Sequence, residues 1–541
     1  MRWLRVIVLL APLALAAQSK PEDTAAISGV VTNSVSGEPV RRAGVTLRRI
    51  TISRTSGTIQ AAQGAYTDAA GRFSLTGIAA GEYRLSAERS GFLTQGYGTK
   101  ATGGSGALLT IEAGQKLNDV ALRLTPHSVI TGRIVDEDGE PVVSASVQIL
   151  RQQYVNGKKQ LTGANASNTN DLGEYRVFGL KPGRYYIGVL GRGNPLIQDA
   201  DDDYVMTYFP RTTDSSAASP VEVTPGGQAR NIDVTLRRVR TVAVRGRITV
   251  EVQPAPGSEA PLRLSVMLMP SSGSFTGGNA RSATVAPQGT FDIRGVTPGA
   301  YTLTAIASGG TRAVSARLPV QVSSGNVEGL AVTIRGGVPL TGRVKIEGDA
   351  PADLKHIGIG LPAEETGLIQ YGPLPAPKMM EDGSFRAEDV GSERYRVVVT
   401  GLPEGCYVKS IRSGEVDVLQ NGLEVAGVPP APVEVLLSSR AAQVTGVALD
   451  AKTQKPVPGA IVVLVPQDKT RTARADYYKN VTTDSAGRFA FKDLTPGEYR
   501  AYAWEDVEPG AWMDAEFLKP YEGEKVSLEE SGRANVQLKV E

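Results

Sequence analysis

Residues 482–499 read TTDSAGRFAFKDLTPGEY, and this stretch of two turns and two short strands decides the fold. The first turn, Asp484 to Gly487, has the Asp and Gly that suit the first and fourth positions of a type I turn. In the second turn, Pro496 fixes one φ angle and Gly497 supplies a positive one. Apolar side chains alternate between the turns, as in a strand with one buried face. The stretch therefore predicts a β-hairpin.

The same pattern recurs five times along the chain. An aromatic residue and a tyrosine lie ten positions apart in every copy: Phe73 and Tyr83, Tyr175 and Tyr185, Phe291 and Tyr301, Phe385 and Tyr395, and Phe489 and Tyr499. An apolar-x-Gly-x-apolar strand precedes each copy, centred on Gly29, Gly132, Gly246, Gly342 and Gly446. Successive glycines are 103, 114, 96 and 104 residues apart, which is the length of one small domain. The regular spacing therefore predicts that the chain consists of five tandem repeats.

Each repeat reads as a small two-sheet antiparallel sandwich. Alternating strands open and close every copy, and no helical period of 10 to 15 residues separates them. The joints between copies are only a few residues long, so we expect a semi-rigid rod or arc. The predicted segments are 1–17 (signal peptide), 26–125, 126–238, 239–337 and 338–438 (both divergent), and 439–541.

The N-terminus is typical of a secretory signal. Arg2 and Arg5 precede the apolar run Val6–Leu15, and small residues follow it. That run is too short to span a bilayer, and no other run is long enough. We expect a chain without a transmembrane segment after cleavage, either secreted or held in the periplasm or at the cell surface. The single cysteine, Cys406, excludes internal disulfides.

The complete motif series resembles the carboxypeptidase regulatory-like domain and its Cna-B and transthyretin-like relatives. The resemblance covers essentially the whole mature chain and is most complete in the first, second and fifth copies. Ala286 replaces the turn Asp in the third copy, and Gly391-Ser392-Glu393 replaces Pro-Gly in the fourth. The resemblance implies an all-β tandem array of about five prealbumin-like (Ig-like) antiparallel β-sandwiches. It also implies that the domains belong among the carbohydrate-binding-like folds. It does not imply peptidase activity.

The residues that common catalytic sites need are scarce. The chain has two histidines, His127 and His356, which are 229 residues apart in different copies. A zinc peptidase site or a Ser-His-Asp site is therefore not expected, and we predict no enzyme activity, cofactor or metal. The loop Asp199–Asp203 is interpreted more simply as a solvent-exposed acidic loop than as a calcium site. A net charge of +2 is not the footprint of a nucleic-acid-binding protein.

Aromatic residues in the fifth copy provide the candidate ligand site. Alternation directs Tyr502 and Trp504 away from the sandwich core, where the first copy has Ser86 and Glu88. The candidate ligand-binding residues are Tyr502, Trp504, Trp512, Phe517 and Tyr521. Sugars stack on exposed aromatic faces, which favours a binding patch. The alternative is that residues 505–525 fold back and bury Trp504 in a second small core.

We therefore expect an exported, non-catalytic, multi-domain binding or scaffold protein of the cell envelope. One function to consider is polysaccharide binding through the fifth copy. The alternative is a structural spacer or protein-interaction subunit of a surface assembly, whose partner is an envelope protein. A third hypothesis, a hydrolase, would need an acidic site such as Glu505, Asp506 and Asp514.

Overall fold

The computed structural model describes most of the chain after the predicted signal peptide. It describes residues 24–50, 62–100, 102–104, 106–191, 202–252, 262–271, 280–309, 312–348, 354, 356–364 and 377–541. The predicted signal peptide and Asp199–Asp201 of the acidic loop lie outside these residues. The described residues form five large hydrophobic cores, and each is built from one repeat. We call the repeats units 1 to 5.

Unit 1 shows the plan that the other units vary. Its opening strand lies at the centre of one sheet, antiparallel to the Gly-x-Phe strand and parallel to the closing strand. The first sheet contains β4 (Arg72–Ile78), β1 (Ala25–Asn33) and β8 (Lys116–Leu124). The second contains β3 (Gln63–Tyr66), β2 (Gly44–Arg49), β5 (Gly81–Glu88), β6 (Gln95–Gly96) and β7 (Leu109–Ile111).

Units 2 and 3 repeat this two-sheet plan. The first sheet of unit 2 has β12 (Glu174–Leu180), β9 (Ser128–Val135), β17 (Gln228–Ala229) and β18 (Val234–Thr235). Its second has β11 (Lys158–Asn168), β10 (Ser146–Val155), β13 (Gly183–Leu190), β15 (Thr207–Tyr208) and β16 (Val221–Val223), and η2 (Ser215–Ala217) follows β15. β14 (Asp202–Tyr204) pairs with β19 (Arg238–Arg240) beside them. Unit 3 has β23 (Thr290–Val296), β20 (Val242–Glu251) and β26 (Val327–Arg335) against β22 (Arg281–Thr284), β21 (Arg263–Pro270), β24 (Gly299–Gly309) and β25 (Arg312–Val322).

Units 4 and 5 depart further from the plan. Unit 4 has one six-stranded sheet of β29 (Lys378–Met379), β30 (Ser384–Val390), β27 (Val338–Glu347), β36 (Val433–Ser438), β33 (Tyr407–Ser413) and β34 (Val416–Asp417), followed by α1 (Val418–Asn421). Short pairs complete it: β28 (Gly358–Gly360) with β32 (Val398–Thr400), and β31 (Arg394–Tyr395) with β35 (Leu423–Glu424). In unit 5, β39 (Lys479–Thr482), β38 (Ile461–Pro466), β41 (Gly497–Trp504), β42 (Glu524–Leu528), β43 (Arg533–Val540), β37 (Ala442–Asp450) and β40 (Arg488–Leu494) are joined in one curled sheet.

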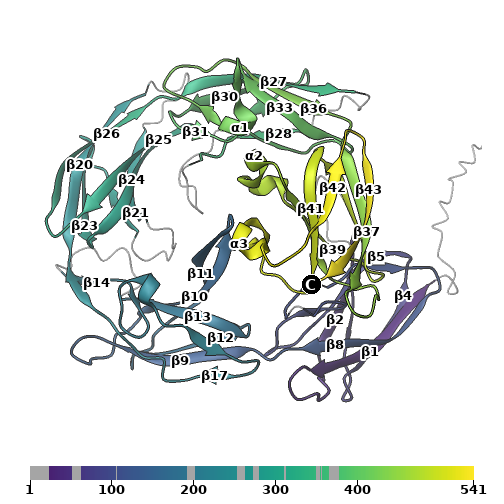
Figure 1. Cartoon of the computed structure of the whole chain (residues 1–541). Helices are drawn as coiled ribbons and strands as arrows, with labels where there is room; N and C mark the ends of the chain where they lie inside the picture. The colour runs from purple at the N-terminus through teal and green to yellow at the C-terminus, as the bar shows by residue number, and fades with distance from the viewer. Residues whose placement is uncertain are drawn as a thin grey trace, which may run out of the picture.

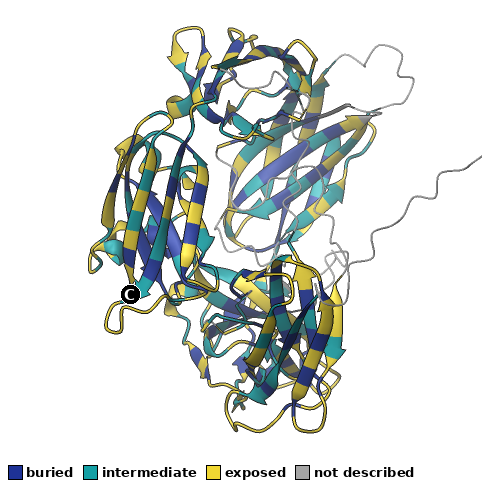
Figure 2. Cartoon of the chain, turned by 90° about the vertical axis from the view of Figure 1, so that its right-hand side faces the viewer, coloured by how far each residue is buried: buried dark blue, intermediate teal, exposed yellow. Residues whose placement is uncertain are grey.

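The prediction of an all-β array of prealbumin-like sandwiches is confirmed, with one refinement. Most strand pairs are antiparallel, but the opening and closing strands of each unit run parallel. Buried and exposed residues alternate along the strands, as the period of two predicts (Figure 2).

Two features of the repeated motif have direct physical causes. In all five copies, with or without the proline, the hydroxyl of the repeated tyrosine donates to the carbonyl oxygen four residues earlier, at 2.7–3.1 Å, and so ties the turn to the strand. The glycine of the opening strand lies directly under the closing strand. A Cβ at Gly446 would be 2.0 Å from the carbonyl oxygen of Val536, so a side chain has no room there.

The units follow one another around a ring, and unit 5 returns to unit 1 (Figure 1). The expected arc therefore curves until its ends meet. Each consecutive joint has a direct polar contact. The contacts are His127 N to Gly91 O at 2.9 Å, Arg281 Nη2 to Asp203 Oδ2 at 2.6 Å, Arg317 Nη1 to Glu393 Oε1 at 3.4 Å, and Gly405 N to Asp493 Oδ1 at 2.6 Å.

Candidate functional site: the aromatic cluster and the closure of the ring

The five candidate aromatic residues of unit 5 come together in one cluster. Tyr502 and Trp504 lie on β41, on the face opposite the sandwich core that contains Tyr499. Trp512 lies on η4 (Ala511–Met513), Phe517 lies on α3 (Ala515–Leu518), and Tyr521 follows α3. This aromatic cluster is a second, separate hydrophobic core.

The rings of the aromatic cluster pack against one another closely. Tyr502 and Trp504 stack with their centroids 5.4 Å apart and their planes 7° apart. Tyr521 meets Trp504 edge-on at 5.5 Å, and Phe517 lies 6.0 Å from Trp504. Trp504 is only 3% exposed and Trp512 only 8%. Both faces of the Trp504 indole ring are therefore largely covered by protein.

The cover over Trp504 is a short helical segment with its own local signals. Gly510 has a φ of +85° at the start of η4, and Asp514 Oδ1 caps α3 by accepting from Glu516 N at 2.9 Å. The indole Nε1 of Trp504 is buried and finds no acceptor among the described residues. The ring is therefore held by packing and not by a hydrogen bond.

A hairpin from unit 2 completes the cover. Strands β10 and β11 meet at an Asn156-Gly157 turn, where both residues have positive φ angles of 49° and 75°. Tyr154 of this hairpin contacts Phe517 edge-on at 6.2 Å. A Cβ at Gly157 would be 2.7 Å from the carbonyl oxygen of Met513, so the hairpin tip lies directly on η4. Figure 1 shows the hairpin extending inward from unit 2 to α3.

The structure thus realises the alternative in which residues 505–525 fold back over Trp504. Among the described residues of this face, Tyr502, Trp504 and Trp512 are buried and Phe517 and Tyr521 are partly buried, because α3 and the unit 2 hairpin cover the cluster. Ligand binding by Tyr502, Trp504, Trp512, Phe517 and Tyr521 stays a prediction. A sugar would reach Trp504 only if the cover moved.

Units 1 and 5 make a second set of ring-closing contacts. Ser485 N donates to the carbonyl oxygen of Leu108 at 3.0 Å. The Lys100 ammonium lies 2.5 Å from the Glu505 carboxylate, although the two residues are 405 positions apart. At Gly459, a Cβ would be 2.0 Å from the carbonyl oxygen of Gly98. The two backbones therefore touch, and the ring is closed at two places.

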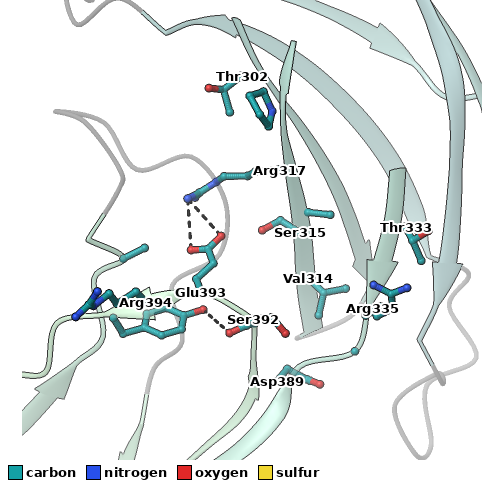
Figure 3. A pocket seen from close by; sticks show the side chains of 16 residues that line it. Thr302, Val314, Ser315, Arg317, Thr333, Arg335, Asp389, Ser392, Glu393 and Arg394 are labelled. Atoms are coloured by element: carbon teal, nitrogen blue, oxygen red, sulfur yellow. Dashed lines mark hydrogen bonds and ion pairs between the residues drawn. The ribbon is translucent and has the colours of Figure 1, made fainter. Parts of the chain in front are cut away.

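A polar pocket, shown in Figure 3, lies at the joint of units 3 and 4 and opens to solvent. Its volume is about 580 Å³, and its walls come from β24, β25, β26 and the turn before β31. The Arg317–Glu393 ion pair crosses it, and Tyr395 donates to Gly391 O at 3.1 Å (Figure 3). Burial, and then the Glu393 carboxylate, raises the pKa of Tyr395 to about 12, so its hydroxyl stays a donor at neutral pH.

Several other residues considered in the sequence analysis also have a place in the structure. Asp203, at the end of the acidic loop, pairs with Arg281 of unit 3 across a joint. His127 and His356 belong to different units, and Cys406 is buried at the joint of units 4 and 5. Within the described segments, no group of three or more His, Cys, Asp and Glu side chains is arranged to hold a metal.

Sequence reasoning missed the unit 2 hairpin as part of the site. Asn-Gly between two alternating strands is a strong hairpin signal, and it stands at Asn156-Gly157. That signal predicts the turn, but it does not predict that Tyr154 reaches unit 5.

None of the described helices is long and apolar enough to cross a membrane.

Comparison with known families agrees with the repeat. The model of the carboxypeptidase regulatory-like domain matches residues 26–124, and the model of a prealbumin-like fold domain matches residues 442–505. These matches fall on units 1 and 5, which contact each other where the ring closes. No curated protein matches the chain.

Solved structures with similarity to the chain include three pilins. A streptococcal ancillary pilin is 12% identical, with 58% of this chain and 99% of that one covered and a TM-score of 0.21. A minor pilin of Streptococcus agalactiae is 11% identical, with coverage of 43% and 99% and a TM-score of 0.23. The major pilin of Bacillus cereus is 9% identical, with coverage of 77% and 99% and a TM-score of 0.17.

Proposed function

Because the chain is a repeat protein of carboxypeptidase regulatory-like and prealbumin-like domains, we propose that it is an exported, non-catalytic scaffold of the cell envelope. The observation that carries this proposal is the closure of the ring. Domains joined only by flexible linkers need no contacts between the first and the last domain, whereas here units 1 and 2 both contact unit 5. Such contacts fix the positions of the five units, and of their outer surfaces, relative to one another.

The chemistry of the joints supports a fixed frame. Between units 4 and 5, Lys409 and Arg440 both pair with Glu347 and Glu530, so two bases and two acids share one cluster. Lys409 and then Tyr407 stabilise the charged form of Glu530 by hydrogen bonding and so lower its pKa. Each exposed pair is worth little, but a network fixes orientation better than a single pair.

The proposal is also consistent with the scarcity of common catalytic residues. The two histidines are in different units, and Glu505, which the hydrolase hypothesis needs, is paired with Lys100. A side chain that closes the ring is poorly suited to act as an acid or base in a reaction.

The proposed partner is a protein or polysaccharide of the envelope. Cross-linking on intact cells, followed by mass spectrometry of the purified adducts, tests the protein arm. The proposal expects recurrent adducts on the outward faces of the ring. Recovery of only internally cross-linked chain from intact cells would contradict a role in a protein assembly.

A further inference from the structure

The outer face of the second sheet of unit 1 is open where unit 5 is covered. Tyr66, at the end of β3, is 81% exposed, although the other large aromatic rings of unit 1 lie in or against the core. Its neighbour across the strands is Gly44 of β2, which in turn pairs with Glu88 of β5. A Cβ at Gly44 would be 3.7 Å from Tyr66 Cε1, so the ring lies beside the bare glycine.

The register shows how unusual this position is among the units. The residues that match Tyr66, Gly44 and Glu88 across the three strands are Asn168, Ser146 and Leu190 in unit 2, Thr284, Ser265 and Ile306 in unit 3, and Thr482, Ile461 and Trp504 in unit 5. Leu190 is buried together with Met206 and Tyr208, and Trp504 is buried against Phe517 and Tyr521. Unit 1 has instead an uncovered aromatic ring and an uncovered carboxylate.

Polar groups surround Tyr66 on this face. The Glu88 carboxylate forms no hydrogen bond or ion pair with the described part of the chain, and it is exposed. Arg89 donates to the carbonyl oxygen of Arg42 at 3.3 Å, and Arg42 is itself an exposed residue that lines the same face. Together with Thr46 and Gly64, these residues line a shallow hollow of about 570 Å³.

We propose that this hollow, the Tyr66 face, binds a neutral polysaccharide. The apolar face of one pyranose ring would stack on Tyr66, as sugars stack on exposed aromatic rings. Hydroxyl groups of the sugar would donate to the Glu88 carboxylate and accept from the Arg42 guanidinium. Gly44 and Gly64 keep the approach flat, which suits a chain of sugars lying along the sheet. Because the face carries both signs of charge, a polyanion is the poorer fit.

The experiment is affinity electrophoresis of the mature chain in gels that contain soluble starch, mixed-linkage β-glucan or xylan. We expect retardation by at least one of these, and a loss of about tenfold in affinity in Tyr66→Ala. Tyr66→Phe should keep the affinity, because the stacking surface remains. Phe178→Ala is the matched control, since Phe178 is also an exposed aromatic residue, 60% exposed, in unit 2.

Three results would overturn the proposal. The first is the absence of retardation in all three gels, and the second is retardation that Tyr66→Ala leaves unchanged. The third is retardation only in a further control gel of the polyanion alginate that disappears at about 0.5 M salt, which would indicate simple charge attraction to arginines. Tyr66 is exposed, so both variants should fold, and far-UV circular dichroism checks this. The proposed scaffold role does not depend on this site, because it rests on the closed ring, which the gels do not test.

Discussion

Units 1 and 5 share one repeat but use the outer face of the same sheet in opposite ways. In unit 5, β41 presents Trp504 on this face, and η4, α3 and the hairpin of unit 2 bury it. In unit 1, the matching strand presents Glu88, and Tyr66 of β3 stays 81% exposed. An extra aromatic residue on a repeat is therefore not evidence of a binding site by itself. The loop that follows its strand decides whether it joins a core or meets solvent.

The largest expected difference between the two faces is in stability. Trp504→Ala removes a buried ring from the aromatic cluster, so we expect it to lower the unfolding free energy of unit 5 by about 3–5 kcal/mol. Tyr66→Ala removes an exposed ring and should cost less than about 0.5 kcal/mol. Urea unfolding followed by far-UV circular dichroism, to which both units contribute, measures the two losses, and the fluorescence of Trp512, which both variants keep, identifies the unit 5 transition. Equal effects of the two substitutions would mean that the two faces do not differ as described.

Gly459→Ala should open the contact between units 1 and 5. A Cβ there would be 2.0 Å from the carbonyl oxygen of Gly98, and the φ of +72° adds strain of about 1–2 kcal/mol. We expect faster hydrogen exchange at the Ser485 amide, which donates to Leu108 O, and a larger radius of gyration in X-ray scattering.

The turn alone does not explain that expected effect. The same turn position holds Arg42 in unit 1 and Ser144 in unit 2, with φ angles of 53° and 58°, so the turn itself accepts a side chain. Unchanged exchange at Ser485 in Gly459→Ala would show that the backbones of units 1 and 5 do not touch in solution.

Tyr154→Ala should have a smaller effect, because it removes one edge-on contact with Phe517. We expect a loss of about 0.5–1.5 kcal/mol from the unit 5 transition and easier quenching of Trp504 and Trp512 by acrylamide. Leu172→Ala, at an exposed side chain of the same unit, is the control. If both variants quench alike, the hairpin of unit 2 does not cover the aromatic cluster.

Local pattern predicted much of this structure. The strands, the turn at Asp484, and the outward direction of Trp504 follow from periods of two and from the backbone preferences of Gly and Pro, which act within a few residues. The Asp484 carboxylate indeed accepts from the backbone N–H of Ala486 and Arg488 at 2.8 and 2.7 Å.

Contacts between distant parts of the chain could not be predicted in this way. Trp504 is covered partly by Tyr154, 350 positions earlier, and no periodicity relates those two residues. Lys100 and Glu505 form an ion pair where the ring closes, but in the sequence they are two ordinary charged residues with no sign that they meet. The repeat alignment distinguishes Tyr66 from the matching residues of units 2 and 5, which are Asn168 and Thr482. Only the exposure of Tyr66 in the structure separates it from a packed residue.

Zero-length carbodiimide cross-linking of the purified monomer tests the closed ring most directly. The reagent joins an amine and a carboxylate that are already in contact, so the account predicts a Lys100–Glu505 cross-link within one chain. Lys409 with Glu347 or Glu530, at 3.0 and 3.1 Å in the joint of units 4 and 5, is the internal standard. Recovery of both cross-links by mass spectrometry supports the closed ring. Recovery of the Lys409 cross-link without the Lys100–Glu505 cross-link would contradict it and show that the chain is an open arc.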